Sequence, residues 1–131
     1  MPRITIVRTR KPKNSDINDD LIWFCRSLGL FGVRDKDKSC FRLFVTLLKA
    51  LKSGRDMTSD EIADNVNLSR GTVIHHMRKL IGSGLVVSRN NKYGLKYDNL
   101  SDILEEMEHE LLRTMDKLKR TAEVIDDRLS L

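Results

Sequence analysis

The C-terminal segment of the chain constrains the fold most, because it can form only one kind of element. No proline or glycine occurs after Gly94, and apolar residues recur at steps of four and three from Leu100 onwards. This heptad alternation, with one stutter, predicts a helix from Ser101 to about Leu129. Its apolar stripe needs a partner, and a second copy, parallel or antiparallel, is favoured over folding back on the same domain. The predicted dimer interface comprises Leu104, Met107, Leu111, Met115, Leu118, Ala122, Ile125 and Leu129.

The distribution of charge divides the chain into a basic body and an acidic tail. Residues 1–97 carry 19 Lys and Arg against 9 Asp and Glu, whereas residues 98–131 carry 5 against 10. The body is therefore suited to a polyanion and the tail to another contact. Residues 1–14 hold five basic residues and no acidic one. They fit either a solvated tail or an arm that follows a phosphate backbone.

The first part of the chain predicts a strand and two helices. The β-branched run at residues 3–7 favours a short strand. Two apolar stripes at helical spacing follow, separated by a polar linker at residues 33–39, and Ser39 is expected to cap the second helix. The first stripe is Ile17, Leu21, Phe24, Leu28 and Phe31, and the second is Cys40, Leu43, Phe44, Leu47 and Leu51. Because only 5% of the residues are aromatic, the core must be mostly aliphatic.

Two short helices with clear start signals come next. The first has the spacing of a capping box and of a hydrophobic staple, and the second has an N-cap serine and another staple pair. These residues are Thr58 with Glu61 and Met57 with Ile62 for the first helix, and Ser69 and Leu68 with Val73 for the second. The first helix should end near Val66, so a tight turn at residues 66–69 joins the two.

A β-hairpin follows the second helix directly. Residues 85–88 and 93–97 favour strands, and the asparagines within residues 89–92 tolerate the positive φ of a tight turn. Helix, short helix, turn, helix and hairpin is the order of a winged helix-turn-helix, mainly α with a small β-hairpin. The predicted divisions are a basic arm and helix at 1–38, the winged helix-turn-helix at 39–97 and a long dimerisation helix at 98–131.

The second helix of the pair has an apolar side and a side without acids. On a wheel of about 100° per residue, the core side holds Val73, Met77, Leu80 and Gly84. The opposite side holds Gly71, His75, Arg78 and Gly82, with Thr72 and Lys79 beside them. No Asp or Glu occurs from Asn65 to Asn91. A solvated helix normally mixes charges, so this face indicates an anionic neighbour.

A nucleic-acid duplex suits the residue types on this face. Arginine can bond guanine through two donors, and histidine and threonine can donate to bases or phosphates. Gly71 lets the helix start approach the backbone, where the free N–H groups suit a phosphate. We therefore expect a recognition helix at 69–82 in the major groove and a wing at 88–93 on the backbone or minor groove. The predicted DNA-binding residues are Thr58, Ser69, Arg70, Gly71, Thr72, His75, His76, Arg78, Lys79, Arg89, Asn90, Asn91 and Lys92.

The stretch LSRGTVIHHMRKLIGSGLVV resembles the recognition helix and wing entry of ArsR-type winged-helix regulators. Their pattern has Leu-Ser, a variable pair, a small residue, Val-Ser-His-His-Leu, a basic residue, and then a Leu and Gly-Leu-Val. The resemblance covers roughly residues 40–97 and implies a dimeric, repressor-like protein that binds a pseudo-palindromic operator. It also implies that Ser69, Arg70, Thr72, His75 and His76 lie at groove-facing positions. Ile74 departs from the pattern, and it can either touch a thymine methyl group or pack.

Metal sensing, which many of these relatives perform, is not predicted. The helix TSDEIADNV has no cysteine pair, and His109 lies beside only glutamates, namely Glu105, Glu106 and Glu110. A single histidine among surface glutamates lacks the ligands that fix a transition metal. Cys25 and Cys40 are expected to be buried, reduced thiols, although a thiol switch between them stays open. No cofactor is expected.

No catalytic constellation stands out, so an enzyme is not predicted. The sequence lacks a paired nucleophile and base, a carboxylate pair and a phosphate loop. No apolar run approaches the roughly 18 residues of a membrane span, and no secretory signal is evident, so the expected location is cytoplasmic. The expected function is sequence-specific regulation of transcription by a homodimer on double-stranded DNA. A non-specific architectural nucleic-acid binder and a winged helix used for protein contacts remain alternatives.

Overall fold

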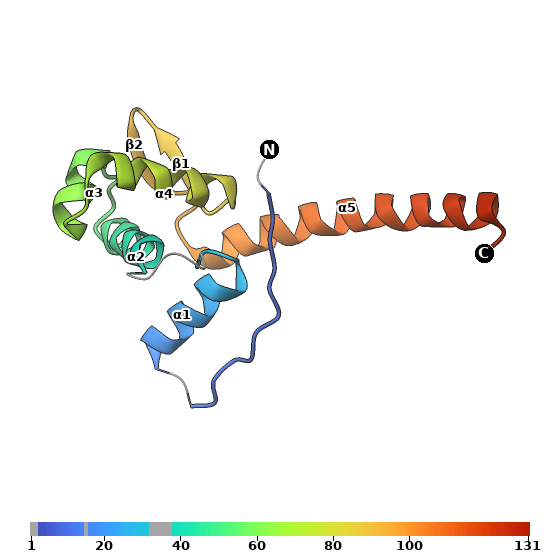
Figure 1. Cartoon of the computed structure of the whole chain (residues 1–131). Coiled ribbons are helices and arrows are strands. Elements are labelled where there is room, and N and C mark those ends of the chain that lie inside the picture. Colours follow the sequence, from blue (N-terminus) through green and yellow to red (C-terminus); the bar gives the residue numbers. More distant parts are fainter. Residues whose placement is uncertain (1–2, 15, 32–37) are drawn as a thin grey trace.

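Five helices and one hairpin make up the described part of the chain. The computed structural model describes residues 3–14, 16–31 and 38–131. The elements are α1 (Ile17–Ser27), α2 (Ser39–Lys52), α3 (Ser59–Val66), α4 (Arg70–Gly82), β1 (Val86–Arg89), β2 (Lys92–Leu95) and α5 (Leu100–Leu129). α2, α3, α4 and the hairpin form a body, α1 lies beside it, and α5 extends away as a long arm (Figure 1). This arrangement confirms the predicted winged helix-turn-helix, mainly α with a small β-hairpin.

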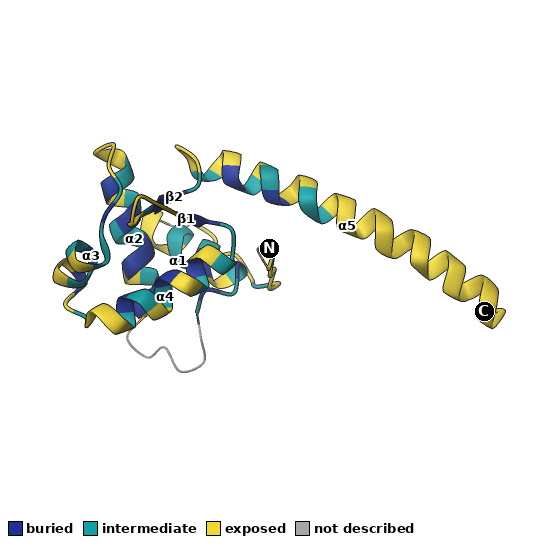
Figure 2. Ribbon diagram, turned by 90° about the horizontal axis from the view of Figure 1, so that it is seen from above, coloured by how far each residue is buried: buried dark blue, intermediate teal, exposed yellow. Residues whose placement is uncertain are grey.

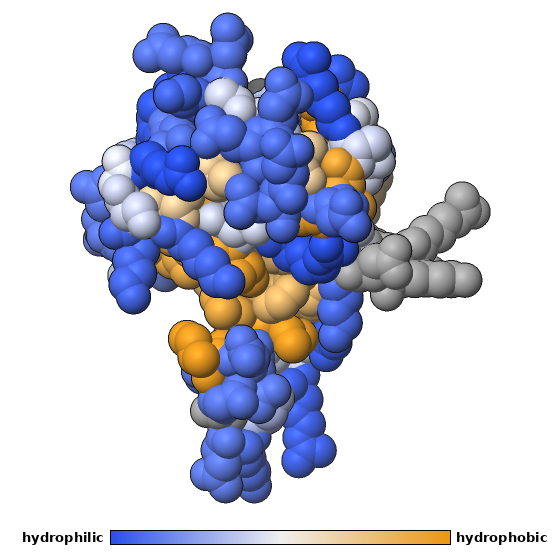
Figure 3. Space-filling view, turned by 90° about the vertical axis from the view of Figure 1, so that its left-hand side faces the viewer, coloured by the Kyte–Doolittle hydropathy of each residue, from blue (hydrophilic) through white to orange (hydrophobic). Residues whose placement is uncertain are grey.

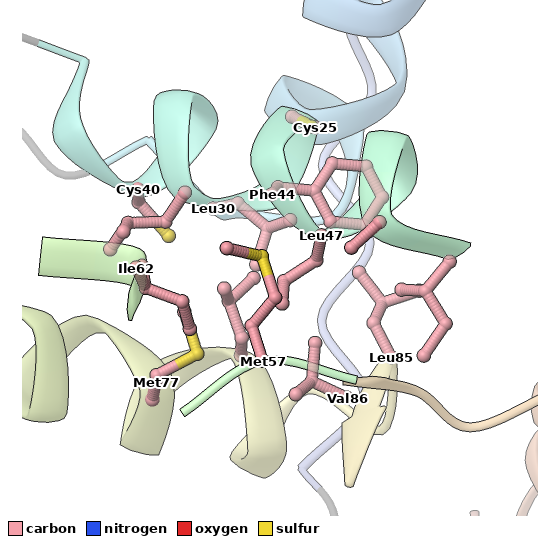
Figure 4. Packing of buried hydrophobic residues seen from close by; sticks show 14 of the residues in the cluster. Cys25, Leu30, Cys40, Phe44, Leu47, Met57, Ile62, Met77, Leu85 and Val86 are labelled. Carbon is pink, nitrogen blue, oxygen red and sulfur yellow. The ribbon is translucent and has the colours of Figure 1, made fainter. Parts of the chain in front are cut away.

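α2 lies at the centre of the core. Its buried side is Cys40, Leu43, Phe44, Leu47 and Ala50, so the predicted face is confirmed except that Ala50 replaces the half-buried Leu51. Side chains from α1, α3, α4 and the hairpin meet this side of α2 (Figure 4). Each large aliphatic side chain that is fully buried contributes roughly 1.5–3 kcal/mol, which makes this shared core the main source of stability.

The hairpin forms as predicted, with small shifts at its ends. β1 and β2 pair antiparallel, with Val86 opposite Leu95 and Arg89 opposite Lys92. β1 begins one residue later than expected and β2 one residue earlier. Met57 extends this sheet, because its N–H and carbonyl both bond Tyr93, at 2.9 and 2.6 Å. The segment before α3 is thereby fixed to the wing.

The strand predicted at residues 3–7 is wrong. This segment is extended, but with the described residues it makes only isolated backbone bonds, from the Arg3 N–H to the Gly82 carbonyl and from the Val7 N–H to the Ser27 carbonyl. Its neighbours are the ends of two helices, which offer single carbonyls rather than the ladder that a strand requires. The segment is further held by the Trp23 indole, which donates to the Thr9 carbonyl at 3.2 Å.

Two details of the first helices also differ from the expectation. α1 ends at Ser27 rather than reaching Phe31, and Gly29 then turns the chain with a φ of 71°. Ser39 does not cap α2: the N-cap is Lys38, which makes no side-chain cap bond, and Ser39 is the first, buried residue of the helix. Most of the predicted polar linker, residues 33–37, lies outside the described residues.

α1 joins the body through an apolar seam. Phe24 of α1 stacks on Phe44 of α2 with ring centroids 6.1 Å apart, and Cys25 is fully buried. Figure 3 shows this face as mostly hydrophilic, with an apolar band between its upper part and the lower part that contains α1. The first residue of the predicted stripe, Ile17, is 71% exposed and lies outside this packing.

Within the described chain, α5 is covered by the body only up to Leu111. Ile103 and Met107 are buried, whereas every residue from Leu112 to Leu131 is exposed (Figure 2). An ion pair of 2.7 Å between Lys96, just after β2, and Glu106 fixes the base of α5. None of the described helices, α5 included, has the length and apolar character that a membrane crossing needs.

Candidate nucleic-acid interface

The turn between α3 and α4 sets the position of α4. Asn67 ends α3 in the left-handed region, with φ 55° and ψ 49°. The Arg42 guanidinium of α2 donates to the Val66 carbonyl, so the otherwise unbonded end of α3 has a partner. A polar bond from the central helix therefore anchors the turn, and α4 leaves it in a fixed direction.

α4 begins with a cap that leaves its first turn accessible. The Ser69 hydroxyl accepts the Thr72 N–H at 3.2 Å and lies 2.8 Å from the Thr72 hydroxyl. A Cβ added at Gly71 would meet no described atom within 4 Å. The first N–H groups of α4 are thus on an open surface, as a phosphate contact requires.

The two sides of α4 are as predicted. Val73, Met77 and Leu80 are each 0% exposed, which confirms these three core positions, whereas Gly84 lies beyond the end of α4 and is half-buried. On the other side His75 and Arg78 are exposed, while Thr72 and His76 are half-buried. The two imidazoles meet edge to face with ring centroids 5.4 Å apart. The structure thus brings four of the predicted residues onto one surface of α4.

Arg70 extends this surface at the start of α4. Its Nε lies 3.7 Å from the Asp60 carboxylate, and the two side chains are 68% and 75% exposed. Such an exposed pair is worth at most about 1 kcal/mol. Arg70 can therefore exchange this partner for a base edge or a phosphate at little cost.

Lys79 lies elsewhere. Its ammonium donates to the Leu30 carbonyl at 3.1 Å, beside the segment that contains Arg3. The helical wheel placed Lys79 next to the exposed side of α4. In the structure its side chain instead points toward Leu30 and Arg3, in the N-terminal part of the chain. Its contribution to the surface formed by His75 and Arg78 is therefore indirect.

The wing presents a short polar tip. Asn90 and Asn91 have φ of 51° and 63°, the pair of positive values that a two-residue hairpin turn needs. Asn90, Asn91 and Lys92 are all exposed. They stand at the end of a hairpin whose base is tied to the body through Met57, so the tip is carried on a supported element.

Arg89, by contrast, is folded back on the hairpin. Its guanidinium bonds the Asp56 carboxylate at 3.2 Å and the carbonyls of Leu95 and Lys96 at 2.9 and 3.0 Å. A Cβ at Gly94 would overlap the Asp56 carboxylate, so only glycine leaves room for this ion pair. Arg89 and Gly94 thus shape the wing.

Thr58 caps the start of α3. Its hydroxyl accepts the Glu61 N–H at 3.1 Å, and the Glu61 carboxylate accepts the Thr58 N–H, which confirms the capping box. This backbone bond, together with the Thr58 hydroxyl, lowers the pKa of Glu61. Thr58 therefore has a local role whether or not it touches DNA.

The part of the site formed by α3, the turn and α4 lies within residues that match a known family. Residues 45–88 match the family model of the bacterial regulatory proteins of the arsR family. The match runs from the middle of α2 through α3 and α4 into β1, and so contains the whole helix-turn-helix. This match covers less than half of the chain, and together with the helix-turn-helix geometry it supports a DNA-binding transcriptional regulator. No curated protein and no solved structure matches the chain.

His109, Cys25 and Cys40 lie outside the matched residues 45–88. Among the described residues they form no metal site. His109 lines a shallow cavity of about 370 Å³ with Tyr97, Asp102, Glu105 and Glu106. Cys25 and Cys40 are both buried and form no disulfide. Burial, with a smaller effect of Cys40, raises the pKa of Cys25 to about 12. A thiol held in this protonated form is a poor nucleophile and a poor metal ligand.

Two residues that position α4 and the wing carry no sequence signal. Arg42 holds the turn from α2, 24 positions away from its acceptor, and Asp56 holds the wing arginine from 33 positions away. Neither lies in a motif with a fixed spacing. Only the folded chain brings these partners together.

Proposed function

We propose that the protein is a sequence-specific regulator that binds double-stranded DNA as a homodimer. α4 enters the major groove, and the wing tip contacts the backbone or the adjacent minor groove. Arg70, Gly71, Thr72, His75, His76 and Arg78 form the groove-facing set. Ser69 and the wing residues Asn90, Asn91 and Lys92 contact phosphates, while Arg89, Lys79 and Thr58 position these elements.

The observation that carries this proposal is the exposed, acid-free side of α4. His75 and Arg78 project from a helix whose opposite side is fully buried, so their directions are fixed by the core. Arg78 can donate two bonds to guanine, and His75 can donate to a base or a phosphate. The accessible first turn at Gly71 supports a phosphate contact in the same register.

The homodimer rests on the unpaired stripe of α5. Met115, Leu118 and Ile125 are 43%, 58% and 47% exposed, and every residue of α5 from Leu112 onwards is exposed in the described structure. An apolar stripe of this length is expected to be covered. Two copies joined by α5 present two α4 helices to a pseudo-palindromic site.

Selection of bound duplexes from a random pool tests the proposal most directly. A common sequence with two inverted half-sites is expected, spaced by about one or more helical turns, ~34 Å each. Recovery of duplexes with no shared sequence would instead identify a non-specific architectural binder.

A salt titration on the selected duplex and a scrambled one completes this test. Each phosphate neutralised contributes about −0.9 to the log–log slope, so both affinities should fall with salt. A regulator retains a specificity ratio well above one throughout. Absence of any DNA binding at about 50 mM salt would favour a winged helix used for protein contacts.

A further inference from the structure

A small pocket opens where α2, the loop after it and α3 meet. Its volume is about 260 Å³, below the roughly 300–1,000 Å³ of sites that hold drug-sized ligands, so it suits a small group. Ala50 and Met57, which are both buried, contribute to its lining. Asn65 lines it from α3 and lies about 140° around that helix from Asp60, the residue that pairs with Arg70. The pocket is therefore separate from the exposed side of α4.

Four side chains with hydrogen-bond donors surround this pocket, and two of them are cations. They are the Lys49 ammonium, the Arg55 guanidinium, the Ser53 hydroxyl and the Asn65 amide. Among the described residues that line the pocket there is no Asp or Glu. The cavity beside His109 has the opposite character, because three carboxylates line it. The pocket between α2 and α3 therefore favours a negatively charged ligand.

The sequence of α2 places the polar wall of the pocket on one side of the helix. No Asp or Glu occurs from Lys38 to Arg55, whereas five Lys and Arg do. On a wheel of about 100° per residue, Thr46, Lys49 and Ser53 lie within about 60° of one another. The apolar side of α2 is buried in the core. The core therefore fixes the direction of this polar side, which α3 adjoins (Figure 1).

The hydrogen bonds within the pocket walls leave donors available for a ligand. Asn65 gives one amide N–H to the Glu61 carbonyl at 2.9 Å and keeps a second. The Glu61 carboxylate, which lies outside the lining, accepts from Nη1 of Arg55 at 3.2 Å, and a guanidinium has five N–H groups. Lys49 forms no ion pair with the described residues. One cation is thus oriented by a neighbour, and the other has no acidic partner in the described chain.

We propose that this pocket binds a phosphate group. Lys49 and Arg55 match the charge of about −2 that a phosphate monoester carries near neutral pH. The donors come from α2, from the loop and from α3, so they approach from different directions, as the oxygens of a tetrahedral anion require. A planar carboxylate is matched by one guanidinium and would leave the other donors without an acceptor. A bound phosphate also offsets the repulsion between the two cations.

The phosphate has two possible sources, a small phosphorylated molecule and the DNA backbone. The position of the pocket favours the small molecule, because α3 separates it from the side of α4 that carries His75 and Arg78. The pocket shares no residue with the proposed groove-facing set. The inference therefore goes beyond the proposed DNA binding and does not depend on it.

Titration of the full-length chain with inorganic phosphate at constant ionic strength tests the site. Calorimetry measures the affinity, and the NMR signals of the Asn65 side-chain amide report the place. Lys49→Gln should weaken phosphate binding about tenfold or more, because it removes a charged donor. Lys52→Gln is the matched control, since Lys52 has the same charge on the same helix but does not line the pocket. Both lysines are exposed, so neither substitution should change Tm.

Two results would overturn the phosphate site: equal phosphate affinities of the Lys49→Gln and Lys52→Gln chains, or phosphate binding no tighter than acetate binding. If phosphate distinguishes the two lysines, a DNA titration identifies the source. A small-molecule source leaves the salt slope of Lys49→Gln equal to that of wild type, whereas a backbone source lowers it by about one. A chain that binds phosphate here but binds no DNA would remove the proposed function and leave this site standing.

Discussion

α4 and α5 both carry a continuous apolar stripe, but the stripe of α4 is buried and most of the stripe of α5 is exposed. In α4, Val73, Met77 and Leu80 are wholly buried by α2, α3 and the hairpin. In α5, the stripe beyond Leu111 is uncovered, and Leu118 is 58% exposed. The apolar side of α4 therefore serves the fold, which leaves its polar side for an external partner. For α5 the apolar side itself is left for a partner.

The charges of the two helices also indicate different partners. The exposed side of α4 bears cations and no acids, which suits a polyanion of uniform charge. α5 bears charges of both signs, which suits a partner that also carries both signs, as a second copy would. The two helices therefore predict partners of different chemistry, and their effects can be separated by substitution.

The largest effect is expected from a charge placed in the uncovered stripe. Leu118→Glu puts two carboxylates into the apolar seam of the proposed dimer, and burial of an unpaired charge is costly. The dimer dissociation constant should rise about 100-fold or more, and DNA affinity should fall with it. Sedimentation and DNA titration measure both. The monomer should remain folded by circular dichroism, since Leu118 is exposed.

Val124→Glu is the matched control. Val124 is 49% exposed on the same helix, but it lies on the opposite side of the wheel, about 160° from Leu104. It should dimerise as wild type does. If both variants dissociated equally, general destabilisation of α5 would explain the result, and the stripe would lose its special role.

The two sides of α4 should respond in opposite ways. Met77→Ala removes a fully buried side chain, and the free energy of unfolding should fall by about 2–5 kcal/mol. His75→Ala, on the exposed side, should change it by no more than about 0.5 kcal/mol but weaken DNA binding. Urea unfolding and DNA titration provide the two readouts. A large loss of stability in His75→Ala would contradict the division into two sides.

Local patterns were sufficient to predict features whose interacting residues lie close together in the sequence. The capping box of Thr58 and Glu61, the Ser69 cap and the core side of α4 all depend on residues within one or two turns. The asparagine pair of the wing likewise specifies its own turn. These features were therefore predicted correctly from the sequence. The order of elements that defines the fold was also predicted correctly.

Features that depend on distant partners could not be predicted. Residues 3–7 have strand-forming side chains, but no strand lies beside them, so the backbone bonds helix ends instead. Lys79 and Arg89 were assigned to DNA from their positions alone, whereas the folded chain offers them carbonyls and a carboxylate. Long cationic side chains are especially prone to such errors, because their reach exceeds what a wheel can describe.

Specificity should depend on the start of α4 more than on the wing. Arg70→Ala removes a flexible arginine with only a weak partner, and base preference should relax by roughly 1–3 kcal/mol at one position. Lys92→Ala should weaken all sequences alike and lower the salt slope by about one. Titration of matched and mismatched duplexes distinguishes the two. Should Arg70→Ala alter neither affinity nor preference, the placement of α4 in the groove would be wrong.

The smallest effect is expected where the body meets α5, at the Lys96–Glu106 ion pair. The hydrogen bond between these side chains lowers the pKa of Glu106 and raises that of Lys96. A lowered carboxyl pKa stabilises the fold above the ordinary glutamate value of about 4.3, and this contribution disappears as pH falls through the lowered pKa. The raised pKa of Lys96 adds stability that is lost only at alkaline pH, above about 10.4.

Glu106→Gln should therefore lower Tm by about 1–3 °C at pH 7, because both side chains are partly exposed. The difference from wild type should shrink as pH falls through the lowered pKa of Glu106, because the wild-type carboxyl then becomes protonated as well. Glu123→Gln, on the exposed part of α5, is the control and should show neither effect. A difference that stays the same over the whole acid range would mean that Glu106 supports α5 through packing. The link between the two regions would then be steric rather than ionic.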